Sequence, residues 1–306
     1  MSRRPILGTR GSPLALAQAG KVASALEVAN HWPANHIEIR VIKTSGDKIQ
    51  DRPLADIGGK ALWTKELDRA LLDKEIDFAV HSLKDVEAVR PPEIRLCAVR
   101  PRGDARECLI GADSIDAIMQ GGIFGTSSPR RAAQLLSLRP DLTIAPLRGN
   151  VDTRLEKVKS GEVDASLLAC AGLKRLGRTG IGTPIPIDTL LPAPTQAVIA
   201  IECRARDTMT QSMLTIIDDR STMAVICAER AFVRALGGNC HSPVAAHGIL
   251  KGGQIRLRAE LYSESGADRI AAEASFAAGD VKAAEELAHS MLDGAPDPIR
   301  RLFAAA

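Results

Sequence analysis

The segment His81-Ser82-Leu83-Lys84-Asp85 follows an apolar run and places a lysine directly beside an aspartate. On a protein surface, such a pair is an ordinary ion pair that adds little stability. In a binding site, the carboxylate of Asp85 could instead transfer protons or stabilise a cation. His81 has apolar neighbours, which favours a packed core histidine over a catalytic one.

Arg130 and Arg131 follow Ser128 and Pro129, a combination typical of the start of a helix. Cations in the first helical turn oppose the helix dipole and cost up to about 1 kcal/mol each when exposed. The same turn has free backbone N–H groups that bind anions. The two arginines are therefore either a solvated surface pair or part of a site for a carboxylate or phosphate.

Further basic residues recur where predicted strands give way to helices. These residues are Arg10, Arg148, Arg154, Lys174 and Arg175. Any one of them could be an ordinary surface charge. Their shared position favours a ligand with several carboxylates or phosphates, because arginine binds such groups with two parallel hydrogen bonds.

Cys240 stands in a polar turn that runs from Gly237 to Pro243. Free cysteine is normally buried, so this residue is a candidate nucleophile or attachment point. Cys240, His241 and His247 are a weak set of metal ligands, and we predict no metal site. The cysteines form no C-x-x-C pair, which indicates reduced thiols in a cytoplasmic protein.

An α/β scaffold is expected to position these residues, because apolar runs and helix-like stretches alternate up to about residue 200. The segment beginning at Gly8 weakly resembles the one beginning at Gly125, which favours two similar α/β domains that face each other across a cleft. The predicted strands are Ile6–Thr9, Ile37–Lys43, Ile76–Ser82, Ile94–Val99, Ile123–Thr126, Leu142–Leu147, Val163–Cys170 and Val198–Glu202. The predicted helices are Pro13–Leu26, Thr64–Lys74, Pro129–Leu138 and Asp152–Lys159, and Asp47–Gly59 is predicted to be a long loop.

The pattern changes from Thr222 onwards and predicts a smaller α+β domain. It predicts a helix over Met223–Leu236, strands at Ala245–Leu250, Gln254–Tyr262 and Arg269–Ala277, and a final helix from Val281. We therefore expect domain 1 at 1–99 with 198–216, domain 2 at 103–193 and domain 3 at 220–306.

Composition excludes several classes of protein. Of 306 residues, 45% are hydrophobic and 25% are charged, which is ordinary for a globular chain of two or three domains. Aromatic residues at 3% and a net charge of +3 argue against a nucleic-acid binder. No apolar run reaches the roughly 18 residues of a membrane span, and the basic N-terminus lacks a signal-peptide pattern. We expect a cytoplasmic protein without membrane or nucleic-acid partners.

Taken together, these segments resemble the porphobilinogen deaminases, also called hydroxymethylbilane synthases. The resemblance runs from Ile6 to at least Pro243, and its motifs occur in the order of the family. They begin at Gly8 (GTRGSPLA), Lys43 (KTSGD), Gly58 (GGK), His81 (HSLKD), Gly125 (GTSSPRR), Leu147 (LRGNVDTR), Ala171 (AGLKRLG) and Cys240 (CHSP).

The resemblance implies a monomeric transferase of tetrapyrrole (haem) biosynthesis. Such enzymes condense four porphobilinogen molecules head to tail, release four ammonia and hydrolyse the product, hydroxymethylbilane, from the enzyme. The chain grows on a dipyrromethane cofactor, which is held by a thioether to a cysteine that matches Cys240. The implied fold has two domains like those of periplasmic binding proteins plus a smaller C-terminal domain, and a late strand, Val198–Glu202, completes the first.

The resemblance also assigns roles to individual residues. Asp85 would accept hydrogen bonds from pyrrole N–H groups, stabilise the cationic azafulvene left by ammonia loss and move protons. Ser12, Ser82, Thr126 and Ser128 would add hydrogen bonds, and Lys60 and Trp63 would belong to a lid that stacks on a pyrrole. Binding of the acetate and propionate groups falls to Arg10, Lys84, Arg130, Arg131, Arg148, Arg154 and Arg175.

This chain departs from the family pattern in a few places. Trp63 replaces a common phenylalanine beside Ala61, and Pro129 replaces a leucine. Thr195-Gln196-Ala197 replaces glycine-glutamine-glycine, which predicts a stiffer crossover between domains and puts a role for Gln196 in doubt. The main rival function is an anion-binding protein of the same two-domain build, which would have no use for a third domain with Cys240.

Overall fold

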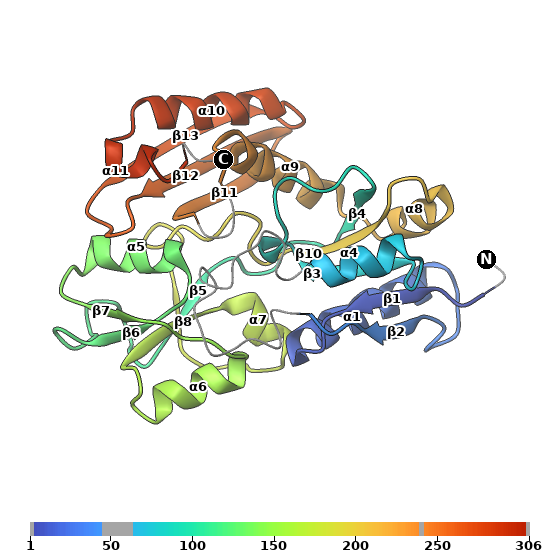
Figure 1. Ribbon diagram of the computed structural model, residues 1–306, viewed down its shortest axis with the longest axis horizontal. Coiled ribbons are helices and arrows are strands. Elements are labelled where there is room, and N and C mark those ends of the chain that lie inside the picture. The colour runs from blue at the N-terminus through green and yellow to red at the C-terminus, as the bar shows by residue number, and fades with distance from the viewer. Residues whose placement is uncertain (1–2, 45–63, 239–241, 304–306) are drawn as a thin grey trace. The chain divides into compact units, whose positions relative to one another are not determined.

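The computed structural model describes residues 3–44, 64–238 and 242–303 (Figure 1). These residues form two compact units. Unit 1 contains residues 3–44, 64–103 and 197–223, and unit 2 contains 104–196 and 224–303. Within the described ranges, no helix is long and apolar enough to cross a membrane.

Unit 1 is built on a five-stranded sheet with the order β2-β1-β3-β10-β4. Strand β1 is parallel to β2 and β3, whereas β10 runs antiparallel between β3 and β4. Because β1 and β3 are parallel, they end at the same edge of the sheet. The strands are β1 (Ile6–Thr9), β2 (Glu38–Val41), β3 (Phe78–Ser82), β4 (Ile94–Val99) and β10 (Ile199–Arg204).

The helices of unit 1 pack on this sheet and bury apolar side chains against it. Helix α1 starts at a Ser12 cap, whose hydroxyl accepts a 3.3 Å hydrogen bond from Ala15 N. Its buried Val22 and Leu26 belong to one core with Leu7 and Phe78 of the strands. The helical elements are α1 (Pro13–Ala29), α4 (Lys65–Leu72), the 3₁₀ turn η1 (Leu83–Asp85) and α8 (Thr208–Thr215).

Unit 2 contains a second five-stranded sheet with the order β7-β6-β8-β5-β9. Strand β6 is parallel to β7 and β8, and β5 is antiparallel to β8 and β9. The strands are β5 (Glu107–Ile110), β6 (Ile123–Gly125), β7 (Thr143–Ala145), β8 (Ala165–Ala169) and β9 (Thr183–Ile185). The helices here are α5 (Pro129–Leu138), α6 (Val151–Lys159) and α7 (Cys170–Arg175).

The C-terminal part of unit 2 is an antiparallel three-stranded sheet, β11-β12-β13. Helix α10 packs on it through the buried Ala284, Ala288 and Met291 (Figure 1). The elements are α9 (Arg220–Ala235), which begins in unit 1, β11 (Val244–Lys251), β12 (Gln254–Tyr262), β13 (Arg269–Ala277), α10 (Val281–Asp293) and α11 (Asp297–Arg300).

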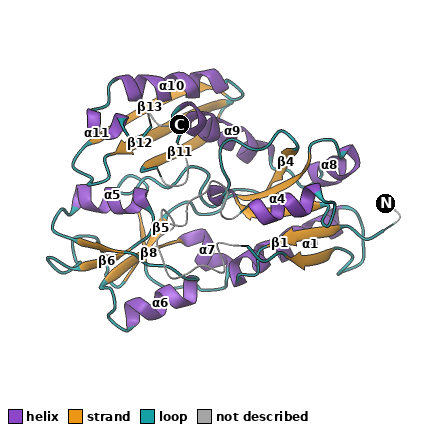
Figure 2. Ribbon diagram, viewed as in Figure 1, coloured by secondary structure: helices purple, strands orange, loops and turns teal. Residues whose placement is uncertain are grey.

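Helices and strands mix in both units (Figure 2), so the predicted α/β class is confirmed. The late strand predicted at Val198–Glu202 is observed as β10. The prediction missed β5, β9, α7 and α8, and Gly172 lies inside α7. Ala171, Gly172 and Leu173 are buried, and tertiary burial of this kind can override the poor helix propensity of glycine.

Candidate functional site

In unit 1, the predicted site residues gather where β1 and β3 end. Arg10 directly follows β1, and Ser12 caps α1. Ser82 ends β3 and exchanges hydrogen bonds of 2.8 and 3.2 Å with the side-chain amide of Gln18. Lys84 and Asp85 lie in the following turn, η1, and both are partly buried. The parallel strands thus bring residues far apart in the sequence to one edge of the sheet.

A buried ionic network supports this edge from within unit 1. Arg90 donates to both carboxylate oxygens of Glu202 at 3.0 and 2.8 Å, and to Asp68 at 2.5 Å. Burial disfavours the charged form of Arg90, but Glu202 and Asp68 more than offset it and raise its pKa. Arg90 also donates to Glu87, two residues after Asp85. The network therefore braces the segment that follows η1.

His81 belongs to the same network, one residue before Ser82. Its Nε2 lies 3.4 Å from Oε2 of Glu202, and its side chain is buried. Burial lowers its pKa, although the negative charge of Glu202 acts in the opposite direction. A buried, neutral histidine agrees with the interpretation of His81 as a core residue.

In unit 2, Thr126 and Ser128 shape the turn between β6 and α5. The hydroxyl of Thr126 accepts from Ser128 N at 3.1 Å, and the hydroxyl of Ser128 caps α5 by accepting from Arg131 N at 3.4 Å. Arg130 and Arg131 then occupy the first turn of α5, as predicted. The local fold therefore follows directly from the Ser-Ser-Pro sequence.

Arg130 and Arg131 are not a solvated surface pair, because they are only 4% and 6% exposed. Both bind the fully buried carboxylate of Glu107, which starts β5. Arg131 donates to it from Nε at 3.0 Å and from Nη2 at 2.7 Å, and Arg130 from Nη2 at 2.5 Å. We call this group the Arg130–Glu107–Arg131 cluster.

The cluster carries two positive charges and one negative charge, so one positive charge is left over. Burial lowers the pKa of Arg130, with Glu107 acting in the opposite direction. Within the described residues, Nε of Arg130 is buried without a hydrogen-bond partner. A buried excess charge and an unused donor are costly unless an anion joins them. The cluster is therefore suited to bind a carboxylate.

The other predicted arginines of unit 2 follow β7 and β8. Both strands pair with β6 in parallel. Arg148 lies three residues beyond β7, because that strand ends earlier than predicted, and Arg154 lies on α6. Nε of Arg154 donates to Gly149 O at 3.1 Å. Gly149 has a φ of 111°, and a Cβ there would lie 2.7 Å from Thr153, so glycine is needed. Arg175 ends α7, and burial lowers its pKa to about 10.

Three predicted residues lie outside the described ranges, namely Lys60, Trp63 and Cys240. Sequence reasoning missed Glu107, Gln18 and Arg90. Glu107 did carry a signal, because it is an acidic residue at the head of the apolar run Glu107–Ile110. Among the described residues, no group of three or more His, Cys, Asp or Glu side chains could hold a metal ion.

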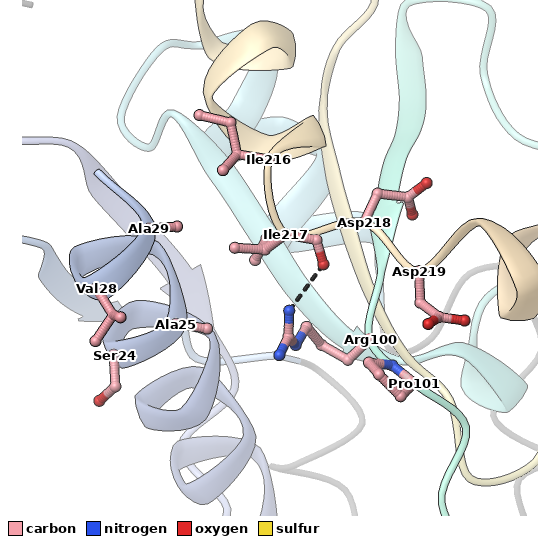
Figure 3. Close-up of a pocket in the computed structure, with 10 residues that line it drawn as sticks. All are labelled: Ser24, Ala25, Val28, Ala29, Arg100, Pro101, Ile216, Ile217, Asp218 and Asp219. Carbon is pink, nitrogen blue, oxygen red and sulfur yellow. Dashed lines mark hydrogen bonds between the residues drawn. The ribbon is translucent and has the colours of Figure 1, made fainter. Parts of the chain in front are cut away.

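A cavity of about 590 Å³ lies in unit 1 (Figure 3). Its walls are α1, from Ser24 to Ala29, and the segments 100–101 and 216–219. Arg100 donates to Ile217 O at 2.8 Å beside it. None of the predicted site residues lines this cavity, so it does not mark the predicted site.

In each unit, basic and hydroxyl side chains gather at the carboxyl ends of parallel strands. This arrangement is typical of α/β proteins that bind anionic ligands at that edge. Residues 6–212 match the family model "Porphobilinogen deaminase, dipyromethane cofactor binding domain", and residues 223–293 match "Porphobilinogen deaminase, C-terminal domain".

Known relatives cover nearly the whole chain. The porphobilinogen deaminase of Sphingopyxis alaskensis is 50% identical over 97% of this chain and 96% of its own. That of Paracoccus denitrificans is 43% identical over 95% and 94%. Among solved structures, the periplasmic VFT2 domain of Bordetella pertussis BvgS is 16% identical over 70% of this chain and 87% of its own, with a TM-score of 0.41. The chain belongs to the porphobilinogen deaminase family.

Proposed function

We propose that this chain is a transferase that condenses four porphobilinogen molecules head to tail. It releases four ammonia and then hydrolyses the linear product, hydroxymethylbilane, from the enzyme. Family membership over 97% of the chain supports this reaction. The product is a precursor of haem and other tetrapyrroles.

The observation that best supports the proposal is the buried Arg130–Glu107–Arg131 cluster with its surplus positive charge. Each porphobilinogen unit carries an acetate and a propionate, so a growing oligopyrrole is a polyanion. A carboxylate would balance the extra charge and accept from the unused Nε of Arg130. A neutral ligand would leave both unsatisfied.

The dipyrromethane cofactor fits this donor set, since its two rings carry carboxylates. We propose that Cys240 holds it by a thioether and that it supplies the nucleophilic pyrrole to which substrate is added. Arg130 and Arg131 would bind its carboxylates, and Ser128 and Thr126 would fix the turn that presents these arginines.

The remaining site residues would act on the substrate and on the growing chain. Asp85 would accept from pyrrole N–H groups, stabilise positive charge on the substrate carbon and move protons. Ser12 and Ser82 would add hydrogen bonds, and Lys60 and Trp63 would belong to a lid. Further carboxylates would be bound by Arg10, Lys84, Arg148, Arg154 and Arg175.

We further propose a cytoplasmic monomer with three domains at 1–99 with 198–216, 103–193 and 220–306. The matches of the two family models, at residues 6–212 and 223–293, support a boundary before the last domain. No nucleic acid or membrane is needed for the reaction.

Incubation of the purified chain with porphobilinogen tests the proposed reaction. We expect one ammonia per pyrrole consumed and a linear tetrapyrrole that cyclises to uroporphyrinogen I on standing. Consumption of porphobilinogen without stoichiometric ammonia, or no consumption at all, would show that the proposed reaction is wrong.

A further inference from the structure

A chain of buried side-chain hydrogen bonds connects Arg130 to the C-terminal sheet of unit 2. Nη1 of Arg130 donates to Oε1 of Gln134 at 2.7 Å, one turn further along α5. Nε2 of Gln134 donates to Oε2 of Glu260, on β12, at 3.3 Å. The same carboxylate oxygen accepts from the hydroxyl of Tyr262 at 2.6 Å. We call this chain the Gln134–Glu260 relay.

Every member of the relay is buried. Gln134 is 1% exposed, Glu260 is 8% and Tyr262 is 4%. The second oxygen of Glu260 accepts from Arg269 at 2.7 Å, so the negative charge of Glu260 is balanced on β13. Glu260 therefore does not neutralise the surplus positive charge of the Arg130–Glu107–Arg131 cluster. The neutral amide of Gln134 connects Arg130 of the cluster with Glu260.

Backbone packing holds α5 against the same sheet. Gly266, in the turn between β12 and β13, has a φ of 71°. A Cβ at this position would lie 2.3 Å from Ala133 O and 2.7 Å from Ser137 N of α5. Only glycine therefore allows the hairpin to approach the helix so closely. The Gln134–Glu260 relay therefore lies where α5 and the C-terminal sheet are in close backbone contact.

The sheet end of the relay is tied to the segment that follows Cys240. Tyr262 N donates to Pro243 O at 3.2 Å, and Pro243 is the third residue after Cys240. From there, β11 runs antiparallel to β12. The backbone that leads out of the cysteine segment and the guanidinium of Arg130 are therefore connected through Tyr262, Glu260 and Gln134.

We propose that Gln134 and Glu260 are positioning residues that hold the Arg130 guanidinium in register with the C-terminal sheet, whose first strand begins four residues after Cys240 in the chain. Their effect is on assembly of the dipyrromethane, because its carboxylates must meet Arg130 while the aminomethyl carbon of porphobilinogen bonds to the Cys240 sulfur. The carbon–nitrogen bond breaks in this step, and ammonia leaves with the thiol proton. This inference rests on the proposed function. Gln134 and Glu260 act through Arg130 and do not contact the reacting atoms.

The test is the rate at which full-length apoprotein gains the cofactor mass when it is incubated with porphobilinogen. Gln134→Met keeps the length of the side chain but removes the acceptor for Arg130 and the donor to Glu260 and to Leu191 O. Because bonds to charged groups are among the stronger ones, we expect assembly on the order of tenfold slower. Gln254→Met, at the exposed start of β12, is the matched control and should assemble at the wild-type rate.

A second variant separates the positioning of Arg130 by the relay from a general effect on the stability of the fold. Tyr262→Phe removes only the hydroxyl at the far end of the relay and should slow assembly about threefold. Gln134→Met combined with Tyr262→Phe should be no slower than Gln134→Met alone, because the relay is already broken. Multiplied effects would mean that the two residues act independently, and the relay would then be wrong.

The remaining outcomes separate this inference from the proposed function. If Gln134→Met assembles at the wild-type rate, or no more slowly than Gln254→Met, the relay has no positioning role. If the wild-type chain itself never gains the mass of a dipyrromethane, the proposed function fails and the inference fails with it.

Discussion

At the scale of single residues, the candidate site combines charged side chains, each of which would be unfavourable to bury alone. The Arg130–Glu107–Arg131 cluster places two guanidinium groups around one carboxylate with almost no solvent contact. Such an arrangement contributes little net stability but is costly to break, because the partners left behind are buried charges. A ligand carboxylate would complete it by balancing its surplus positive charge.

Glu107→Gln should destabilise the fold by about 3–5 kcal/mol, because it leaves two like charges buried together. Urea unfolding measures the change. Asp104→Asn is the control, since Asp104 pairs with Arg106 at a partly exposed site, and should cost no more than about 1 kcal/mol. Equal losses in the two variants would contradict the central role of Glu107.

Asp85→Asn should keep the fold and lose nearly all turnover. The side chain is partly buried in η1 and its replacement is nearly isosteric, so little packing changes. An amide cannot stabilise a cation as a carboxylate does. Steady-state rates with a thermal melt as the control measure this, and a wild-type rate in Asp85→Asn would rule out the proposed role.

At the scale of elements, the parallel strands bring the site residues together and a buried network fixes the end of β3. The network spans β3, α4, β10 and the segment after η1 through His81, Asp68, Glu202 and Arg90. Glu202 is fully buried, so its orientation is set by Arg90 and not by solvent. This gives the turn with Lys84 and Asp85 a rigid support.

The network makes stability depend on pH through His81. Burial lowers the pKa of His81 below its ordinary value of 6.5, so the unfolded chain binds a proton that the folded chain does not. Its contribution to stability is therefore full above 6.5 and is lost as the pH falls towards the lower folded-state pKa. Over that window the slope is at most about 1.4 kcal/mol per pH unit.

Urea unfolding of wild-type protein and His81→Gln between pH 7 and 5 tests this dependence. The variant should show a shallower slope, whereas His289→Gln, at an exposed position of α10, should keep the slope of the wild type. An unchanged slope in His81→Gln would mean that His81 binds protons equally in the folded and unfolded chains, which would contradict a lowered pKa.

The crossover at Thr195-Gln196-Ala197 has a strained backbone. Thr195 and Ala197 have φ values of 60° and 72°, which residues other than glycine rarely adopt. Thr195 N is held by Glu229 at 2.5 Å, and Gln196 Nε2 donates to Ala105 O at 2.8 Å. Thr195 and Ala197 thus keep a left-handed backbone, and buried hydrogen bonds hold the segment that contains them.

Ala197→Gly should therefore raise the free energy of unfolding by up to about 1 kcal/mol, because relief of strain outweighs the added flexibility of the unfolded chain. Urea unfolding checks this. Ala17→Gly in α1 is the opposite control and should lose about 1 kcal/mol. A loss of stability in Ala197→Gly would show that the left-handed backbone is not strained.

At the scale of the whole molecule, local patterns predicted much of the fold. Strands β12 and β13 match the predicted bounds because their side chains alternate, and α5 starts where Ser128 and Pro129 place it. Strand β5 was missed because its Glu107 is buried by tertiary ion pairs that no local pattern reveals. Likewise, the Arg90–Glu202 pair joins residues 112 positions apart, and Gly172 is helical although glycine has a poor helix propensity.

The site was predicted in a similar way. Strand ends and helix caps indicated an anion site around Arg130 and Arg131, but they left a solvated surface pair open until burial decided against it. The resemblance to the family supplied the ligand chemistry, which charge and spacing could not specify. The partners that orient the site, Glu107, Gln18 and Gln134, required the folded structure.

The most direct test of the central claim is the intact mass of the purified chain. We expect the polypeptide mass plus one covalent dipyrromethane, a positive reaction with a pyrrole-specific dye, and loss of both in Cys240→Ser. A wild-type mass equal to that of the bare polypeptide, with no dye reaction, would contradict it.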